Sequence, residues 1–170
     1  MDNWRFGAMA IAVLMAASAA SPSLADSSPR VAGWIENAWL INPGMSFEAK
    51  LDTGARTSSV HAPGAEIYRK GGKRFVKFTL ASPSGRSMQL DLPLVRISMT
   101  RDMNGPTIKR PVVMLRMCAA GVIGETEVNL SNRPGFNYAL LIGRTFMVNR
   151  IIVDSAREKL HPAACAGDTK

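Results

Sequence analysis

The sequence predicts an all-β domain, and three observations support this prediction. Short runs such as residues 75–80 alternate apolar and polar side chains, which is typical of strands that expose one face to solvent. Turn signals such as Asn42-Pro43-Gly44 recur between these runs. No long segment repeats its apolar residues at the period of an amphipathic helix. This combination is typical of a barrel or sandwich of short strands.

The strands are expected in regular succession. Residues 60–67 cross to a hairpin that turns at Gly71-Gly72, because tandem glycines accept positive φ angles. Residues 121–130 form either a further strand or a hairpin, and residues 144–149 form one helical turn. The remaining strands, of which the last two are expected to be buried, lie at residues 31–40, 47–51, 75–80, 88–92, 95–100, 110–117, 139–142 and 151–153.

The amino terminus is typical of a secretory signal. Arg5 gives a positive start, residues 6–20 are apolar, and small residues precede Asp26, so residues 1–25 are expected to be removed by a signal peptidase. The alternative is an uncleaved anchor, although the apolar run is short for a membrane span. Residues 26–170 then form one exported, periplasmic domain with no transmembrane segment.

The chain is basic, with a formal net charge of +8. In an envelope compartment such a protein meets anionic partners, including acidic peptides, lipid headgroups and wall polymers. Nucleic acid is not expected as a partner, because aromatic residues do not interleave with the basic ones. The main basic cluster comprises Lys70, Lys73, Arg74 and Lys77, and its simplest interpretation is a solvated hairpin.

Two cysteines, Cys118 and Cys165, follow the signal. An even number of cysteines in an exported protein predicts a disulfide bond, and two free thiols are the alternative. A bridge would fix the carboxy-terminal tail and would stabilise the fold by roughly 3–4 kcal/mol through the entropy of the unfolded chain.

One short segment predicts chemistry. Asp52 ends the strand expected at residues 47–51, so a rigid element delivers its carboxylate into a tight turn. Gly54 allows the backbone to approach closely, and hydroxyl side chains such as Thr57 can stiffen the turn by bonding to backbone. The simpler alternative is a surface turn, because Asp-x-Gly is ordinary turn chemistry. The full segment reads Leu51-Asp52-Thr53-Gly54-Ala55-Arg56-Thr57-Ser58-Ser59.

A second segment, Leu141-Ile142-Gly143, gives the first one its meaning. Alone it indicates only a buried strand that ends at a glycine. Aspartic peptidases, however, pair their Asp-Thr-Gly loop with a downstream segment of two apolar residues and a glycine. The combination therefore favours Asp52 as a catalytic carboxylate, with Leu141, Ile142 and Gly143 packed behind its loop.

The likeness extends over nearly all of residues 31–165. The chain resembles a bacterial family whose members are named ATP-dependent zinc proteases or retropepsin-like aspartic peptidases. The motifs that carry this resemblance are Gly33-Trp34-Ile35-Glu36, Ala49 to Ala62, Arg110-Pro111-Val112-Val113, Asn129-Leu130-Ser131-Asn132-Arg133 and Leu141-Ile142-Gly143-Arg144. The resemblance implies a closed barrel of one lobe that dimerises, and an association with glutamate-ligating enzymes suits acidic peptide substrates.

The residues do not support zinc or ATP. The chain has two histidines, His61 and His161, neither in a zinc-binding spacing. His61 is expected to be a hydrogen-bonded loop residue, and the alternative is a direct contact with Asp52. No glycine-rich Lys-Ser/Thr loop is present for ATP. We therefore expect neither a metal nor a cofactor.

With one Asp-Thr-Gly in a single domain, an aspartic dyad requires two chains. Asp52 of each subunit would then meet on a two-fold axis and activate a water molecule, while Thr53 braces the opposite loop. Residues 101–109 are the expected lid. Arg56 and Arg144 are possible substrate-binding residues, and Arg56 has the alternative of pairing with Asp154. The competing hypothesis is a non-catalytic periplasmic binding or regulatory module.

Overall fold

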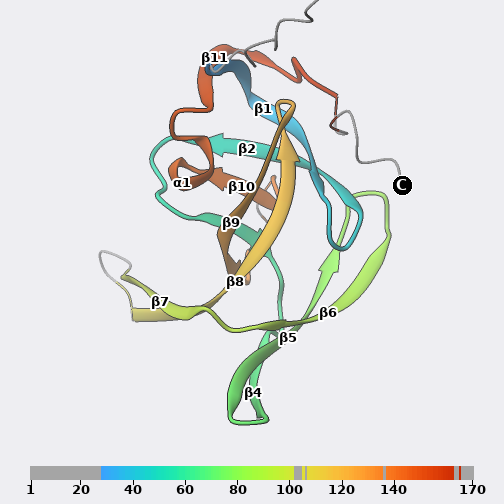
Figure 1. The fold of residues 1–170 in the computed structure, drawn as a ribbon, viewed down its shortest axis with the longest axis vertical. Helices are drawn as coiled ribbons and strands as arrows, with labels where there is room; N and C mark the ends of the chain where they lie inside the picture. The colour runs from blue at the N-terminus through green and yellow to red at the C-terminus, as the bar shows by residue number, and fades with distance from the viewer. Residues whose placement is uncertain (1–27, 102–104, 106, 136, 163–164, 166–170) are drawn as a thin grey trace, which may run out of the picture.

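The computed structural model describes residues 28–101, 105, 107–135, 137–162 and 165, and their fold is all-β, as predicted (Figure 1). One short helix, α1 (Arg144–Met147), corresponds to the expected helical turn. The strands are β1 (Arg30–Leu40), β2 (Met45–Asp52), β3 (Ser58–His61), β4 (Glu66–Lys70), β5 (Lys73–Ala81), β6 (Ser87–Pro93), β7 (Arg96–Arg101), β8 (Thr107–Ala119), β9 (Val122–Ser131), β10 (Leu140–Gly143) and β11 (Ile151–Glu158).

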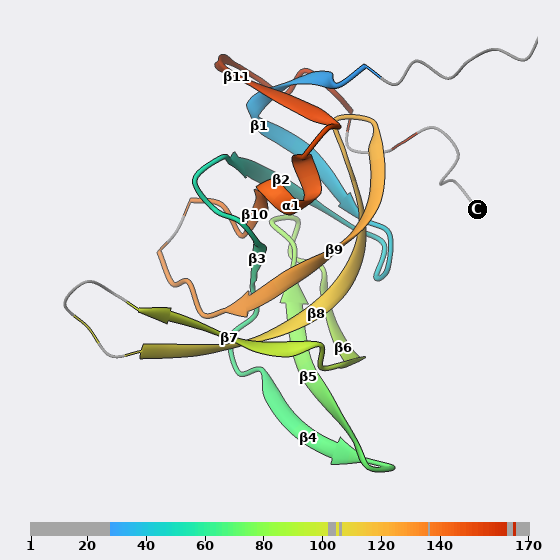
Figure 2. The same ribbon diagram turned by 60° about the vertical axis from the view of Figure 1, so that its left-hand side comes forward.

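The main sheet has the strand order β11-β1-β2-β10-β3-β9-β8-β7. Strand β1 also pairs with β8, so the six strands from β1 to β8 in this order form a closed ring of pairings. The expected closed barrel therefore corresponds to a ring of strands, with β11 and β7 outside it. A second sheet of β4, β5 and β6 lies toward the lower end of the molecule, and its β4–β5 end extends below the ring in both views (Figure 2).

The alternation of side chains decides which residues enter the core. In β2, Met45, Phe47, Ala49 and Leu51 are buried, because every second side chain of a strand points to the same face. Burying an apolar side chain of this size contributes roughly 1.5–3 kcal/mol. The residues between them point the other way, which places Asp52 on the polar face of the ring.

The structure decides one open sequence expectation and revises another. Of the two alternatives for residues 121–130, the strand is present: β9 begins at Val122, and the turn before it lies at Ala120 and Gly121, with φ angles of 51° and 71°. Residues 151–153 are not buried throughout, since Ile152 is 54% exposed. The physical reason is that β11 is an edge strand, which pairs with β1 alone.

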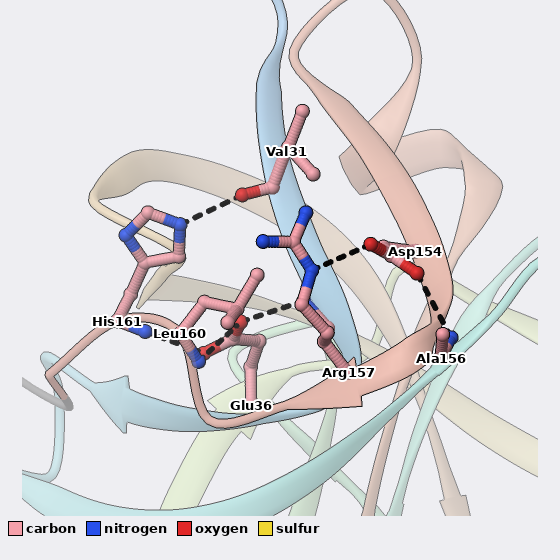
Figure 3. Close-up of polar contacts among 8 residues, drawn as sticks. Val31, Glu36, Asp154, Ala156, Arg157, Leu160 and His161 are labelled. Carbon is pink, nitrogen blue, oxygen red and sulfur yellow. Dashed lines mark hydrogen bonds and ion pairs between the residues drawn. The ribbon is translucent and has the colours of Figure 1, made fainter.

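Glu36 ties the carboxy-terminal segment to the ring (Figure 3). Its carboxylate is fully buried and accepts hydrogen bonds from the backbone N–H groups of Gly33 (2.8 Å), Leu160 (3.1 Å) and His161 (3.1 Å). A Cβ atom at Gly33 would lie 2.5 Å from the Arg157 carbonyl oxygen, so only glycine lets β11 cross here. The motif Gly33-Trp34-Ile35-Glu36 therefore has a structural role.

The predicted disulfide between Cys118 and Cys165 is present, with a Cα–Cα distance of 6.0 Å. Cys118 lies in β8 and is buried, so the bridge attaches the tail beyond His161 to the ring. Residues 1–25, the expected signal, lie outside the described residues. Within the described part of the chain, no helix has the length and apolar character needed to span a membrane.

Candidate active site

Asp52 is the last residue of β2 and is half-buried. Its Oδ1 atom accepts hydrogen bonds from the backbone N–H groups of Gly54 (3.0 Å) and Ala55 (3.2 Å). Such bonds to a carboxylate are stronger than those between neutral groups, so the loop orients the side chain. A Cβ atom at Gly54 would lie 3.3 Å from Asp52 Oδ1, so the atom that Gly54 approaches is the carboxylate oxygen rather than a backbone atom.

The loop after Asp52 is bonded to the start of α1. Ser58 Oγ accepts the Gly143 N–H (3.1 Å), and the carbonyl of Ala55 accepts the Arg144 N–H (2.9 Å). The carbonyl of Arg56 accepts both the N–H and the hydroxyl of Thr145, at 2.9 and 2.7 Å. These bonds join the loop to Gly143 and the first residues of α1, while Gly54 and Ala55 bond to Asp52 itself. A reactive carboxylate needs this kind of preorganisation.

The Leu141-Ile142-Gly143 segment lies beside β2 in parallel register. Leu141 pairs with Lys50, Ile142 with Leu51 and Gly143 with Asp52. A Cβ atom at Gly143 would lie 2.7 Å from the Thr57 carbonyl carbon, so backbone packs directly on backbone. The structure therefore places this segment against the Asp-Thr-Gly loop.

The Arg144 side chain is exposed, but it is hydrogen-bonded to the Asp-Thr-Gly loop. Its Nη1 atom donates to the carbonyls of Thr53 (2.7 Å) and Gly54 (2.9 Å). These bonds satisfy two carbonyl groups on the exposed side of the Asp-Thr-Gly turn. The structure thus gives Arg144 a positioning contact, which the sequence did not distinguish from substrate binding.

Arg56 does not pair with Asp154, so that alternative is wrong. Asp154 Oδ2 binds Arg157 Nε (2.6 Å), and its Oδ1 accepts the Ala156 N–H (2.8 Å). The backbone N–H and the Arg157 guanidinium lower the pKa of Asp154. Arg56 is exposed instead and lines a cavity of about 660 Å³ together with the paired residues Arg96 and Glu127.

Two basic residues line the cavity that holds Asp52, and sequence reasoning gave them no function. A cavity of about 420 Å³ holds Asp52 together with Lys50, Arg133 and Tyr138. Burial lowers the pKa of the Arg133 guanidinium, the nearby charge of Arg110 lowers it further, and Asp52 opposes both. Arg133 also donates to Ser59 Oγ (3.0 Å). The site therefore places one carboxylate among several cations.

Signals for two of these residues were present in the sequence. Lys50 precedes Asp52 by two positions in a strand, so both side chains share one face. Arg133 ends one of the motifs that carry the family resemblance. The fold brings it to Asp52 because β3, whose Ser59 pairs with Leu141 of β10, also pairs with β9.

His61 is hydrogen-bonded, as expected, but it is the last residue of β3 rather than a loop residue. Its Nδ1 atom accepts the backbone N–H of Arg133 at 3.0 Å, so the imidazole of His61 fixes the loop that follows β9. Among the described residues, no group of three His, Cys, Asp or Glu side chains could hold a metal ion. The expected lid, residues 101–109, lies partly outside the described residues, and its arms belong to β7 and β8.

The ring of strands and the Asp-Thr-Gly loop backed by an apolar-apolar-glycine segment define a retropepsin-like domain. Residues 31–164 match the RimB-like family, described as "Retropepsin-like aspartic endopeptidase RimB", and the chain belongs to this family.

Similar proteins of known sequence or structure extend this comparison. A "Probable alpha-L-glutamate ligase" of Shewanella pealeana is 32% identical over 123 residues, which cover 68% of this chain and 27% of that protein. One of Desulfotalea psychrophila is 26% identical over 65% of this chain and 25% of its own length. The chain thus spans about a quarter of these curated relatives. A solved Legionella pneumophila protein of unknown function has 32% identity and a TM-score of 0.67, covering 78% of this chain and 98% of that one.

Proposed function

We propose that this protein is an aspartic-type endopeptidase that acts as a homodimer, with Asp52 of each subunit forming the catalytic pair. The observation that carries this proposal is the position of Asp52. Its carboxylate ends a strand, is oriented by the N–H groups of Gly54 and Ala55, and opens into a cavity of about 420 Å³. The family to which the chain belongs supports the same chemistry.

In the dimer, two carboxylates a few ångströms apart share one proton, because both cannot ionise cheaply. The ionised carboxylate takes a proton from a bridging water, and the protonated one donates to the scissile carbonyl. The water oxygen attacks the carbonyl carbon to give a tetrahedral intermediate, and no covalent enzyme intermediate forms. The intermediate collapses when the C–N bond breaks and the leaving nitrogen takes the proton that the first carboxylate removed from the water. The pair titrates as one unit, so activity is expected at acid to mildly acid pH.

The surface beside the loop supports a second copy as the partner. Thr53 and Gly54 are exposed, which leaves Thr53 available to brace the facing loop. A cavity of about 360 Å³ adjoins Thr53 and is lined largely by apolar side chains, including Met147, Val148 and Val153. Val148 is 61% exposed in the single chain. Contact with a second loop would bury this apolar surface.

The cations around Asp52 support an acidic peptide or isopeptide substrate. Lys50 and Arg133 line the same cavity as Asp52, and Arg110 lies near enough to Arg133 to lower its pKa. A substrate carboxylate would bind these groups by charge-assisted hydrogen bonds. The curated relatives are named as glutamate ligases, so glutamate-containing peptides are the first substrates to test. Export to the periplasm, with removal of residues 1–25, is part of this proposal.

Asp52→Asn tests the proposal, because it keeps the size of the side chain and removes the carboxylate. Hydrolysis of glutamate-rich peptides between mildly acid and neutral pH should fall by at least about a thousandfold, while circular dichroism remains that of the wild type. Asp154→Asn is the matched control, since it makes the same chemical change at a carboxylate that binds Ala156 and Arg157 and does not line the cavity around Asp52. Undiminished cleavage by Asp52→Asn would end the aspartic mechanism, whereas no cleavage by the wild type would leave the non-catalytic periplasmic binding module as the explanation.

A further inference from the structure

The hairpin of β4 and β5 projects away from the ring of strands at the lower end of the molecule in both views (Figures 1 and 2). Its strands are joined by Gly71 and Gly72, whose φ angles are 56° and 76°. A turn with two positive φ angles matches the twist of the strands and makes a tight tip.

The tip of this hairpin places like charges opposite each other. Arg69 pairs in register with Arg74, and Lys70 pairs with Lys73. Like charges directly opposite in an antiparallel pair are unfavourable. All four side chains are exposed, and within the described part of the chain none forms an ion pair or a side-chain hydrogen bond. The fold therefore leaves this repulsion uncompensated, whereas a bound anionic surface would relieve it.

The charges also surround the tip. Because neighbouring side chains of a strand point to opposite faces, Lys70 and Lys73 occupy one face of the hairpin, and Arg69 and Arg74 occupy the other. Ile67 lies on the same face as Arg69 and is 42% exposed. A convex tip that is cationic on both faces suits end-on contact with a flat anionic surface, whereas an extended acidic chain is better held in a groove.

We propose that the β4–β5 tip is a docking site for a membrane surface rich in anionic phospholipid. Each of the four cations would approach lipid phosphate groups, and clusters of four to eight basic residues near such a surface bind it by electrostatic attraction. The proposal does not depend on hydrolysis at Asp52, because the hairpin belongs to the second sheet.

Sedimentation of the full chain with phospholipid vesicles tests this inference. The first variant replaces Arg69, Lys70, Lys73 and Arg74 with Gln, and the matched control replaces four exposed cations elsewhere, namely Arg86, Lys109, Arg116 and Arg157. Both variants lose the same formal charge and keep the apolar residues 6–20. The vesicles contain either phosphatidylglycerol with phosphatidylcholine or phosphatidylcholine alone.

The tip variant should lose at least about tenfold of its partitioning onto the anionic vesicles, and the control less than about threefold. Added salt should weaken wild-type binding to anionic vesicles, because it screens exposed charges. A variant that exchanges Arg and Lys at the four positions should bind like the wild type, which separates charge from folding defects. Equal losses in both Gln variants would overturn the proposal. The proposal would also be overturned if the wild type bound poly-glutamate but not anionic vesicles, and if the tip variant lost the binding to poly-glutamate.

Discussion

Asp52 and Gly143 are register partners in the parallel pair of β2 and β10. Gly143 has no side chain, and the loop that begins at Asp52 rests on its backbone. A Cβ atom there would meet the Thr57 carbonyl carbon at 2.7 Å and the Arg56 carbonyl oxygen at 2.8 Å. The position of the carboxylate therefore depends on a glycine that contributes no chemistry of its own.

Gly143→Ala should displace the Asp-Thr-Gly loop, because the added methyl group meets backbone atoms that have little room to move. Overpacking of this kind costs about 1–3 kcal/mol, which urea unfolding would measure, and peptide hydrolysis should fall further than stability alone explains. Gly54→Ala is the comparison, since its Cβ would meet only a side-chain oxygen at 3.3 Å. Equal stability of Gly143→Ala and the wild type would contradict the close packing.

Arg144→Gln separates positioning from substrate binding. The guanidinium holds the carbonyls of Thr53 and Gly54, so its loss should lower kcat by about 10–100-fold through misplacement of the loop. KM for a glutamate-rich peptide should change little. Lys50→Gln should do the opposite and raise KM, because Lys50 lines the cavity around Asp52. A pure KM effect in Arg144→Gln would assign it to substrate binding instead.

Glu36→Gln should destabilise the fold by about 2–3 kcal/mol, because the buried carboxylate accepts three backbone N–H groups and an amide offers one acceptor atom. Chemical denaturation of the oxidised protein gives the free energy of unfolding. Glu125→Gln, at an exposed position, should change that energy by less than about 0.5 kcal/mol. A neutral result for Glu36→Gln would show that the carboxy-terminal segment is held by other contacts.

Asp154 should contribute to the acid sensitivity of folding. Its folded-state pKa is lowered from 3.8 by the Ala156 N–H and by Arg157, so ionised Asp154 favours the folded state above that value. This contribution is lost as the pH falls through the lowered pKa. Asp154→Asn should therefore differ from the wild type in its urea midpoint near neutral pH and converge with it in acid, while peptide hydrolysis is retained. A difference in urea midpoint that widens in acid would show that ionised Asp154 does not favour the folded state.

The sequence predicted what depends on local alternation and missed what depends on strand order. Residues 47–51 alternate regularly, which was enough to place Asp52 at the end of a strand. The exposure of Ile152 was missed because an apolar residue in an edge strand resembles one in a central strand. Arg133 was missed as a neighbour of Asp52 because their proximity depends on β10 and β9 pairing with opposite edges of β3. The closure of the ring by β1 and β8 is likewise a long-range pairing.

Subunit mixing tests whether the active unit needs two copies of Asp52. Inactive Asp52→Asn chains that exchange with wild-type chains should form heterodimers with one carboxylate, which lack the acid–base pair. At equal concentrations, hydrolysis per wild-type chain should fall to about half, because only random wild-type pairs remain active. Val148→Asp is the companion variant, since a charge on the apolar surface beside Thr53 should oppose dimerisation and lower activity at dilute concentration. Sedimentation velocity would report the oligomeric state of each preparation. Unchanged activity per wild-type chain after complete exchange would mean that one Asp52 suffices, and the shared-proton mechanism would then be wrong.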